Sequence, residues 1–551
     1  MSDDHRPYYI TTPIYYVNGR PHLGHGYTTV IADVLARFQR MLRGSGAEVF
    51  FLTGTDEHAD KVVSTAASRG MTPQEWAGQN AEAFEAFFRD LRISNDDFIR
   101  TSQDRHKAKV EAYIRSMLDS GDIYKGDYTG WYDPGQEEYV TETAARENEY
   151  KSPVSGEPLE KRTEQNYFFR LSAYQDRLEE LIRSEQYLVL PEARRNEVLG
   201  RLTQGLRDVP VSRAVGDGAS GQEPWGVLMP GDPEHRIYVW IDALFNYLST
   251  VDTDERRHLW PASVHLIAKD ILWFHAVIWP AMLMALGREL PRSLYVHAYF
   301  MMGERKMSKS LGNFVTPEEI HAYADRYGID AFRWYLATQG PWGANDADFT
   351  YAKFVEVYNA DLANGFGNST SRVSNMVAKY FESCPDPAGQ TELEGHDWPK
   401  LTGEAVCSAV DASGRLDVAS MLKAGLSLVR AVDGYINTTE PFRLAKTIES
   451  DPHAGPRLAA ILYHCAEALR VASLLLYPAM PDKVAELWRR WRCSPLTDAN
   501  NADSGFVAPL AELAAWGGAH SLKPGQHIEK GEPLFMRADP AEPEPGVKPA
   551  G

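Results

Sequence analysis

Cysteine is scarce and basic residues are outnumbered in this sequence. Its 551 residues hold four cysteines, whose spacing fits neither a disulfide framework nor paired metal ligands: Cys384, Cys407, Cys465 and Cys493. We expect them to be reduced packing residues of a cytoplasmic protein. The 57 Lys and Arg residues face 76 Asp and Glu residues, so the net charge is −19. This negative charge argues against nonspecific binding of nucleic acid over the whole surface. Nucleic acid could bind only at a local cluster of basic residues.

Long apolar runs and targeting segments are also missing. Met1–Arg6 lacks the basic-then-apolar layout of a signal peptide. The apolar stretch 274–286 contains His275 and Pro280 and is shorter than the run of about 18–20 residues that a membrane span needs. We therefore predict no contact with a membrane. Hydrophobic residues make up 44% and charged residues 24%, which is typical of a soluble globular protein and excludes collagen-like, disordered and coiled-coil classes.

The N-terminal region shows alternating strand and helix patterns. Tyr8–Thr12 is β-branched and aromatic, turn residues follow at 18–21, and apolar residues recur at helical spacing over 30–42. Gly44 ends this helix, and Val49–Leu52 is a short apolar run typical of a strand buried on both faces. The pattern predicts an α/β fold with a doubly wound, Rossmann-type parallel sheet, which binds ligands at the carboxyl ends of its strands.

Changes in composition divide the chain into five parts. We predict the two halves of the Rossmann domain over 1–117 and 229–350, an inserted β-rich connective module over 118–228, an all-α domain over 351–525, and a C-terminal tail over 526–551. The insert is rich in Gly, Pro, Asp, Glu and Tyr. We expect the tail to pack back on the protein before its last residues become mobile.

A pair of histidines marks the junction of the first loop and the first helix. His22 and His25 flank Gly24, and glycine admits a ligand close to the backbone. A helix N-terminus favours anions through its free N–H groups and its dipole, so this site could hold the phosphates of a nucleotide. In most proteins, the two histidines of such a string only cap a helix or lie on the surface. The strand, loop and helix around this one favour the phosphate site.

A second motif lies much later in the chain. Lys306–Ser310 (KMSKS) places two lysines and two hydroxyls in a short loop that can clamp a polyphosphate, although lysine pairs usually lie in solvated loops. Together with His22–His25 (HLGH), this motif resembles those of the class I aminoacyl-tRNA synthetases. A small-molecule adenylyl- or cytidylyltransferase is the weaker alternative, because such enzymes share the first motif only.

The sequence between these motifs resembles one family of that class, the methionyl-tRNA synthetases. The resemblance rests on the blocks 52–58 (LTGTDEH), 238–243 (YVWIDA) and 265–275 (HLIAKDILWFH), and it extends from Tyr8 to Phe535. It implies that L-methionine reacts with ATP to give methionyl-adenylate and pyrophosphate. The methionyl group then passes to the 2′-hydroxyl of the terminal adenosine of initiator and elongator tRNA(Met), with release of AMP.

The resemblance also assigns residues to each ligand. The methionine side chain is implied to lie among aromatic walls, which make favourable contacts with sulfur, and Asp56 is implied to bind the α-ammonium group. The implied methionine site comprises Ile14, Tyr16, Asp56, Trp240, Ala243, Tyr247, Ile271 and His275. The implied ATP site comprises His22, Gly24, His25, Asp270, Lys306 and Lys309, among which His22, His25, Lys306 and Lys309 act in catalysis.

No general acid or base is required in the first step, so catalysis is expected to depend on alignment and on cations that face the developing phosphate charge. Mg²⁺ is expected to bridge oxygens of ATP rather than occupy a protein cage. One position departs from the family, because Ala268 stands where the family has glycine before Lys-Asp. We expect its methyl group to shift ATP slightly without abolishing binding.

The insert lacks the cysteines with which many family members bind zinc. After Gly130–Tyr132 the chain continues with 133–136 (DPGQ), and Ser152 and Ser155 stand at the second expected pair. These side chains cannot form a tetrahedral thiolate site. We therefore predict no structural zinc and no other metal site, with the insert held instead by aromatic side chains: Trp131, Tyr132, Tyr167, Phe168 and Phe169.

Three polar residues of the helical part recur every four positions. Asn364, Asn368 and Arg372 would form one stripe on a helix, which is usually a solvated face. Their match to the family's anticodon-binding helix implies that Asn368 and Arg372 read the CAU anticodon, because amide and guanidinium groups bind the edges of unpaired bases. Phe442 stands where the family usually has a stacking Trp, so it keeps an aromatic face and loses the indole N–H.

Two further expectations follow from the resemblance. No segment resembling the appended tRNA-binding and dimerisation domain of some members is found, so we expect a monomer. A catalytically silent paralogue that serves as an RNA-binding or regulatory module remains the alternative, against which the intact residues of both motifs and Asp56 argue.

Overall fold

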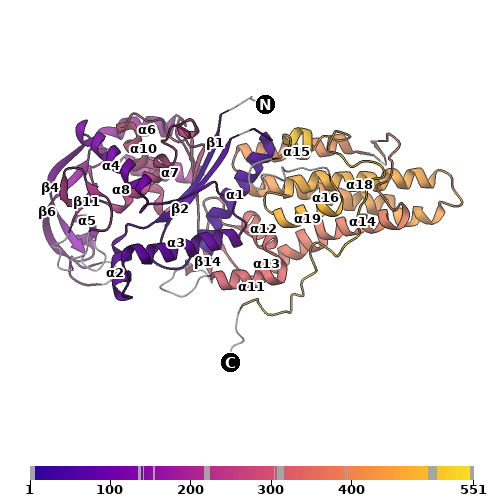
Figure 1. Cartoon of the computed structure of the whole chain (residues 1–551), viewed down its shortest axis with the longest axis horizontal. Coiled ribbons are helices and arrows are strands. Elements are labelled where there is room, and N and C mark those ends of the chain that lie inside the picture. Colours follow the sequence, from indigo (N-terminus) through magenta and orange to yellow (C-terminus); the bar gives the residue numbers. More distant parts are fainter. Residues whose placement is uncertain are drawn as a thin grey trace.

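In the computed structural model of the chain, the first strand–helix–strand unit forms where the sequence predicts it (Figure 1). Strand β1 (Tyr8–Tyr16) leads into helix α1 (Leu23–Arg43), and β2 (Val49–Asp56) returns parallel to β1. Helix α1 ends at Gly44, whose φ of 74° lies in the left-handed region that favours glycine. The residues that the structure describes are 6–46, 48–133, 138–140, 142–152, 156–215, 224–302, 305–306, 315–390, 392–393, 395–493 and 506–546.

Six parallel strands form the central sheet, in the order β3-β2-β1-β12-β13-β7. The chain moves outward from β1 through β2 and β3 on one side and through β12 and β13 on the other. The order therefore reverses between β1 and β12, where a doubly wound sheet opens a crevice for ligands. This confirms the predicted Rossmann-type fold. The other strands are β3 (Asp97–Arg100), β7 (Leu188–Leu190), β12 (Val264–Ala268) and β13 (Ser293–His297).

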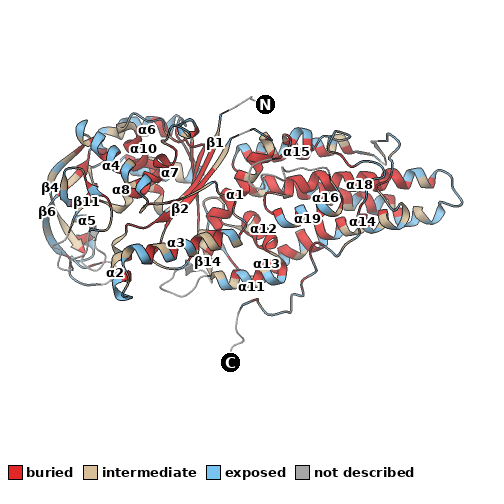
Figure 2. Cartoon of the chain, viewed as in Figure 1, coloured by how far each residue is buried: buried red, intermediate tan, exposed pale blue. Residues whose placement is uncertain are grey.

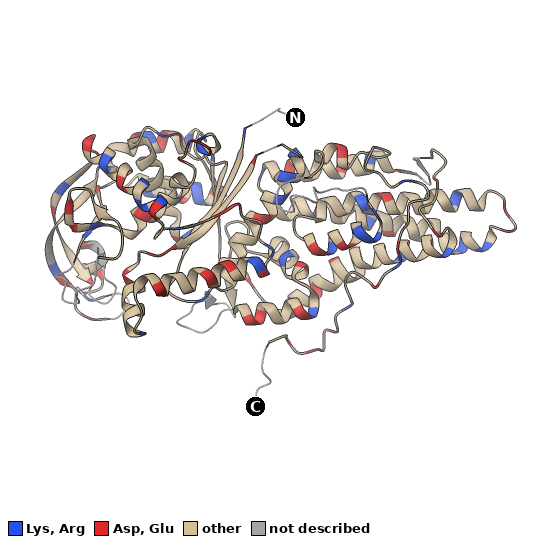
Figure 3. Cartoon of the chain, viewed as in Figure 1, with Lys and Arg blue, Asp and Glu red and all other residues tan. Residues whose placement is uncertain are grey.

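Both faces of this sheet are buried (Figure 2). Phe51 packs into one hydrophobic cluster, and the next residue, Leu52, packs into a second cluster on the opposite face. The first cluster continues through α1 into the helical bundle. Charged residues lie mainly on the outer faces of the helices, as on α3 and α11 (Figure 3). The helices of this part are α2 (Asp60–Ser68), α3 (Pro73–Asp90), α4 (Asp104–Asp119), α6 (Gln175–Arg183), α7 (Glu192–Leu202), α8 (Val239–Leu244), α9 (Asn246–Ser249), α10 (Trp279–Ala285), α11 (Pro317–Tyr327) and α12 (Ile329–Gln339).

Antiparallel strands and short helices share the range 118–228. Strands β4 (Ile123–Asp133) and β6 (Glu160–Phe169) pair along their length in a sheet of order β5-β4-β6-β8. The same range contains β7, which joins the central sheet beside β13, so part of it belongs to the Rossmann fold. The remaining elements are β5 (Glu138–Val140), α5 (Glu142–Glu147), β8 (Val209–Pro210), β9 (Ser212–Ala214), β10 (Leu228–Met229) and β11 (Asp232–Ile237).

Between Phe349 and Cys493 most of the described residues are helical, as predicted, and they form an elongated bundle beside the sheet (Figure 1). In 506–546 only α20 is helical. The first long helical segment is kinked at Gly365, which has a ψ of −106°. Gly365 lies in the π-helix η6, which is followed by α14. The elements are α13 (Tyr351–Val357), η6 (Tyr358–Gly367), α14 (Asn368–Tyr380), β17 (Glu392–Leu393), β18 (His396–Asp397), α15 (Trp398–Gly414), α16 (Val418–Thr439), α17 (Pro441–Leu444), α18 (Ala454–Leu476), α19 (Pro481–Arg490) and α20 (Leu510–Leu513).

Helix α18 is the centre of this bundle. Among the described residues it is the one helix long and apolar enough to cross a membrane, with a mean hydropathy of 1.4. Its apolar stretch is wholly buried inside the protein, where α14, α15 and α16 pack against it. The prediction from apolar runs overlooked this helix because His464, Glu467 and Arg470 interrupt its sequence.

The C-terminal tail packs along the bundle and reaches α11. The hydroxyl of Tyr358 donates to the carbonyl of Met536 at 2.7 Å, and the amide of Asn359 pairs with the backbone of Ala538. Farther on, the hydroxyl of Tyr323 donates to the carboxylate of Glu544 at 2.6 Å. Mobility was expected for the last ten residues, of which 547–551 lie outside the described part. For 542–546 the expectation is wrong, because Nη1 of Arg326 on α11 donates to the carbonyl of Pro543 at 2.6 Å.

All four cysteines are free, as expected. Cys384 and Cys465 are buried and Cys493 is partly buried. Cys407 is exposed on α15, so the expectation that it packs in the core is wrong. The reason is its position in the helical period, which places it on the outer face of α15, whereas Ala405 and Ala409 of the same helix are buried.

The packing of β2 against β3 can be tested at Gly54. A Cβ atom there would overlap the carbonyl oxygen of Ile99. We expect Gly54→Ala to lower the free energy of unfolding by about 1–3 kcal/mol in urea titrations, because the backbone must shift. In Gly78→Ala, the matched control on α3, the nearest atom to the new Cβ is 3.8 Å away. That variant should be about 0.5–1 kcal/mol more stable than the wild type. Equal stability of all three proteins would contradict this packing.

Candidate active site

A cavity of about 450 Å³ opens at the carboxyl ends of the central strands. Its lining includes the ends of four of them: Ile14 of β1, Asp56 of β2, Ala268 of β12 and His297 of β13. This is the switch point at which the sheet order reverses. The residues implied for methionine, all of which line the cavity, are Ile14, Tyr16, Asp56, Trp240, Ala243, Tyr247, Ile271 and His275. Four of the residues implied for ATP join them: His22, Gly24, His25 and Asp270.

Two histidines cap the first turn of α1. The N–H of Gly24 donates to Nδ1 of His22 at 3.1 Å, and the N–H of His22 donates to Nδ1 of His25 at 3.1 Å. Because each Nδ1 accepts, each neutral ring carries its proton on Nε2, which can donate to a phosphate oxygen. The first turn holds no acidic residue, so the positive end of the helix dipole favours an anion. The capping role and the phosphate-binding role are therefore compatible.

Gly24 is required by the position of His22. A Cβ atom on Gly24 would lie 3.0 Å from Cε1 of the His22 ring, which is tighter than ordinary packing. Any larger residue would push this ring away from the hydrogen bond that it makes with the backbone. The glycine thus preserves both the cap and the open approach to the helix end.

Aromatic rings form one wall of the cavity. The ring of Tyr16 meets Trp240 edge-on at 5.8 Å, and Phe274 stacks on Trp240 at 4.4 Å. Trp240 belongs to α8, and Phe274 begins the short π-helix η4 (Phe274–Ile278). Such a wall suits an unbranched thioether, because sulfur makes favourable contacts with aromatic rings.

A chain of hydrogen bonds holds a second wall. Nδ1 of His275 donates to the carbonyl of Ile271 at 3.0 Å, and the hydroxyl of Tyr247 donates to Nε2 of His275 at 2.8 Å. The hydroxyl of Tyr9 in turn donates to the carbonyl of Tyr247 at 2.7 Å. Burial lowers the pKa of His275 to about 4, so the ring is neutral near pH 7 and keeps this tautomer. Both side chains are thereby held in one orientation.

Two carboxyl groups near the cavity have opposite surroundings. Asp56 is 2% exposed and accepts a hydrogen bond from the N–H of His58 at 3.4 Å. Burial, and then the negative charge of Asp242, raise the pKa of Asp56 well above its usual value. Burial would also raise the pKa of Asp242, but contacts with His58 at 2.7 Å and His106 at 3.1 Å outweigh this effect and lower it.

The surroundings of Asp56 select for a positively charged group. No Lys or Arg in the described part of the chain forms an ion pair with this carboxylate, and the nearby charge is that of another acid. A buried carboxylate is costly to ionise unless a cation pairs with it. An α-ammonium group would supply the missing charge and a charge-assisted hydrogen bond.

Asp270 and Ala268 lie at the rim of the cavity, and Ala268 is the residue that replaces the glycine of the family. Asp270 is exposed on the turn η3 (Lys269–Ile271), and its charge adds to burial in raising the pKa of Tyr299. Nζ of Lys269 lies 2.7 Å from the carboxylate of Asp346, which anchors this turn. Ala268 lines the same cavity, so its methyl group adds to a wall where the family has only backbone.

The second motif lies mostly outside the described residues. The strand β15 (Arg305–Lys306) pairs with β14 (Phe300–Met302), and Phe300 lines the cavity. Lys309 and the rest of 307–314 lie outside the described part. The chain resumes at Val315, whose carbonyl accepts a hydrogen bond from the N–H of Leu23 in the first turn of α1 at 3.1 Å. The described residues on either side of 307–314 therefore pack against elements that border the cavity.

The residues predicted to bind the anticodon do not form one straight stripe. Asn364 lies in η6 and Asn368 begins α14, with the kink at Gly365 between them, so the prediction of a single regular helix is wrong. Close packing of the tail accompanies the kink, since a Cβ on Gly367 would lie 3.3 Å from the backbone nitrogen of Phe535. Both asparagines are exposed.

Arg372 and Phe442 have different surroundings. Arg372 is partly buried, with its guanidinium 3.7 Å from the carboxylate of Asp433. The carboxylate also accepts a hydrogen bond from the hydroxyl of Ser369 at 2.7 Å, so Arg372 has a fixed partner. The ring of Phe442 on α17 is 42% exposed, which is unusual for a large apolar side chain and leaves an aromatic face open to solvent.

The insert is braced by aromatic side chains. The ring of Trp131 packs on Tyr150 at 4.5 Å, and its Nε1 donates to Glu142 at 2.7 Å. Within the described residues, no group of three or more His, Cys, Asp or Glu could hold a metal ion. Residues 134–137 and 153–155, which include much of the altered zinc motif, lie outside the described part. The absence of zinc therefore stays a prediction.

One buried polar group was not predicted. Asp242 bridges His58 and His106, and Nδ1 of His106 lies 2.8 Å from the hydroxyl of Ser249. His58 and Asp242 belong to the sequence blocks that carry the family resemblance. His106 has no sequence signal, because only the fold places α4 beside α9.

Comparisons with known proteins agree with this site. The family model described as "tRNA synthetases class I (M)" matches residues 8–374. A methionine–tRNA ligase of Streptomyces coelicolor is 41% identical over 97% of each chain, and one of Bacillus subtilis is 37% identical over 98% of this chain and 79% of its own length. A structure of Mycobacterium tuberculosis methionyl-tRNA synthetase in complex with methionyl-adenylate has a TM-score of 0.82 and 34% identity, covering 97% of this chain and all of that one.

The parallel sheet, the cavity at its switch point and the matched family model define a class I aminoacyl-tRNA synthetase. Within that class, the extent and identity of the matches show that the chain belongs to the methionine–tRNA ligases. The alternative of a silent RNA-binding paralogue is not favoured by these relatives.

The protonation state of His275 can be measured directly. Side-chain ¹⁵N NMR of the protein should show a neutral ring protonated on Nδ1 at pH 6–7, with a titration midpoint of about 4. Because the folded-state pKa lies below the usual 6.5, unfolding takes up a proton in acid. This contribution to stability is fully present above pH 6.5 and is lost as the pH falls toward 4. A midpoint near 6.5 would contradict the hydrogen-bond chain.

Proposed function

We propose that this methionine–tRNA ligase forms methionyl-adenylate in the cavity at the ends of β1, β2 and β12. The carboxylate of methionine attacks the α-phosphorus of ATP, a mixed anhydride forms, and pyrophosphate leaves. The 2′-hydroxyl of the terminal adenosine of tRNA(Met) then attacks the acyl carbon, so that an ester forms and AMP leaves. The observation that carries the proposal is one cavity in which three features meet: a buried carboxylate with no cationic partner among the described residues, an aromatic wall and a histidine-capped helix N-terminus.

Methionine is held by charge at one end and by rings at the other. Asp56 binds the α-ammonium group, which orients the carboxylate for attack. Tyr16 and Trp240 contact the thioether side chain, while Tyr247 and His275 hold the opposite wall. The similarity to a mycobacterial enzyme solved with methionyl-adenylate supports this assignment.

ATP binds with its phosphates at the start of α1. Nε2 of His22 and of His25 donates hydrogen bonds to phosphate oxygens, and Asp270 accepts from the ribose hydroxyls. Lys306 and Lys309 close over the pyrophosphate and face the negative charge that develops during the reaction. Mg²⁺ enters as part of the ATP complex and is held by phosphate oxygens, where it lowers the repulsion met by the attacking carboxylate.

The bundle recognises the anticodon of initiator and elongator tRNA(Met). Asn368 and Arg372 bind the edges of unpaired bases, and Asn364 extends this surface. Phe442 stacks on a base, which its exposed ring supports. The proposal further includes a cytoplasmic monomer without structural zinc, in keeping with the four free cysteines.

Methionine-dependent ATP–pyrophosphate exchange, measured with all twenty amino acids, tests the first step. We expect exchange with methionine alone. In Asp56→Asn the KM for methionine should rise about 10–100-fold, because a charge-assisted hydrogen bond of about 1.5–3 kcal/mol is lost. Asp60→Asn is the matched control, since this acid pairs with Arg236 away from the cavity lining and should leave the exchange unchanged. Exchange with another amino acid would contradict the assignment of the methionine pocket. No exchange with any amino acid would contradict the proposal that the protein is an active enzyme.

Aminoacylation of tRNA(Met) tests the anticodon surface. In Phe442→Ala we expect the KM for tRNA to rise about tenfold, since stacking on one base contributes about 1–3 kcal/mol. The exchange reaction should not change, because it needs no tRNA. Ile448→Ala is the control, as Ile448 is a similarly exposed apolar residue. An equal effect of both substitutions, or none of either, would contradict a stacking role for Phe442.

A further inference from the structure

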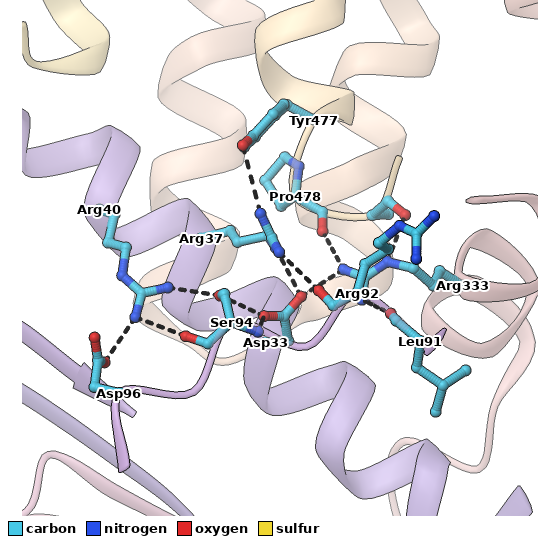
Figure 4. A network of polar contacts seen from close by, with 11 residues as sticks. Asp33, Arg37, Arg40, Leu91, Arg92, Ser94, Asp96, Arg333, Tyr477 and Pro478 are labelled. Atoms are coloured by element: carbon cyan, nitrogen blue, oxygen red, sulfur yellow. Dashed lines mark hydrogen bonds and ion pairs between the residues drawn. The ribbon is translucent and has the colours of Figure 1, made fainter. Parts of the chain in front are cut away.

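Charged side chains are buried where α1 meets the helical bundle (Figure 4). Asp33 of α1 and Arg333 of α12 are both inaccessible to solvent, and Nη2 of Arg333 lies 2.6 Å from Oδ2 of Asp33. The same oxygen accepts from Nε of Arg37 at 2.8 Å. Oδ1 of Asp33 accepts from the N–H and the hydroxyl of Ser94, at 2.7 and 2.6 Å. Both oxygens of the carboxylate are therefore engaged by donors from three segments of the chain.

The guanidinium of Arg333 ties these segments to the bundle. Its Nη1 donates to the carbonyl of Leu91 at 2.8 Å, just after α3. Its Nη2 donates to the carbonyl of Pro478 at 2.8 Å, and its Nε donates to that of Ala479 at 3.1 Å. Pro478 and Ala479 form the turn between α18 and α19. One side chain thus joins α1, the segment after α3, α12 and the end of α18.

Stability alone does not explain such a network. The desolvation of two buried charges offsets most of their attraction, and apolar residues of similar volume often stabilise a protein as well. Hydrogen bonds between charged groups have a fixed geometry, however, whereas apolar contacts allow small sliding movements. Most of the surrounding contacts between α1 and the bundle are apolar, and the buried hydrogen bond from Nε2 of Gln39 to the hydroxyl of Ser413, at 3.2 Å, joins two uncharged groups. The network is therefore the part of this contact that fixes orientation.

Helix α1 connects the network to the cavity. Asp33 lies about 16 Å along the helix axis from His22, at a rise of about 1.5 Å per residue. At the other side, α18 ends at the network and packs along α14, which carries Asn368 and Arg372. Asp33 and Arg333 therefore connect the bundle to α1 directly.

We propose that Asp33, Ser94 and Arg333 are positioning residues that couple the bundle to the first turn of α1. When tRNA occupies the bundle, the network holds α1 in the orientation that favours transfer to the tRNA. None of the three residues lines the cavity. This inference rests on the proposed function, because it requires tRNA on the bundle and nucleotide at α1.

The test compares three reactions of Arg333→Lys and of the milder Ser94→Ala. They are methionine-dependent ATP–pyrophosphate exchange, charging of full-length tRNA(Met), and charging of an acceptor-stem fragment without an anticodon. We expect exchange and fragment charging to stay within about twofold of the wild type. The kcat for full-length tRNA should fall about tenfold in Arg333→Lys and less in Ser94→Ala. Should Arg333→Lys fail to fold, Ser94→Ala carries the test alone.

Arg470→Lys is the matched control. Arg470 forms an equally buried ion pair with Glu467 inside α18 and donates to the carbonyl of Leu513 at 2.7 Å. This variant should lower the melting temperature without changing the ratio of full-length to fragment charging. Equal losses on both tRNA substrates in Arg333→Lys, an unchanged full-length kcat in both network variants, or the same change of ratio in Arg470→Lys would overturn the coupling. Failure of the wild type to exchange with methionine would instead overturn the proposed function.

Discussion

Helix α1 is buried on all sides over 26–36, because it lies between the central sheet and the helical bundle. Although the hydroxyl of Tyr27 has no hydrogen-bond partner among the described residues, a helix in such a position must pair most of its polar side chains inside the protein. Asp33 does so with Arg333 and Ser94, and the hydroxyl of Thr28 lies 2.8 Å from Nε2 of His297 beside the cavity. The contact of Thr28 with His297 holds the N-terminus of α1 at the cavity, whereas the contacts of Asp33 set the orientation of the helix toward the bundle. The anion-binding end of the cavity depends on the first contact, and the coupling to the bundle depends on the second.

Burial acts in opposite directions on the acids and bases around this cavity. It raises the pKa of Asp56 and lowers that of His275 to about 4, so the walls carry little charge of their own. The ammonium and phosphate groups of the ligands therefore meet Asp56 and the start of α1 in surroundings of low polarity, where electrostatic attraction is strong. Asp242 stays ionised in the same region because His58 and His106 surround it.

Part of the cavity lining could be predicted because short motifs carry those residues, whereas His297, Tyr299 and Phe300 also line the cavity and belong to none of these motifs. The HLGH string and the sequence blocks that contain Asp56, Trp240 and His275 can each be recognised from a few neighbouring residues. The supporting contacts could not be predicted in this way. Asp33 and Arg333 are separated by 300 residues, and no local pattern pairs them. The same holds for His106, which reaches Asp242 only because α4 packs beside α9.

The sequence by itself determined the strand–helix–strand unit at the N-terminus, the mainly helical nature of the chain over 350–493, and the chemistry of the HLGH motif. These follow from side-chain patterning, turn residues and capping, which act between residues close in the chain. Tertiary structure alone decided that β7 joins the central sheet, that Gly365 kinks the polar stripe, and that α18 becomes a buried core helix. In each case, packing between distant segments outweighed the local pattern.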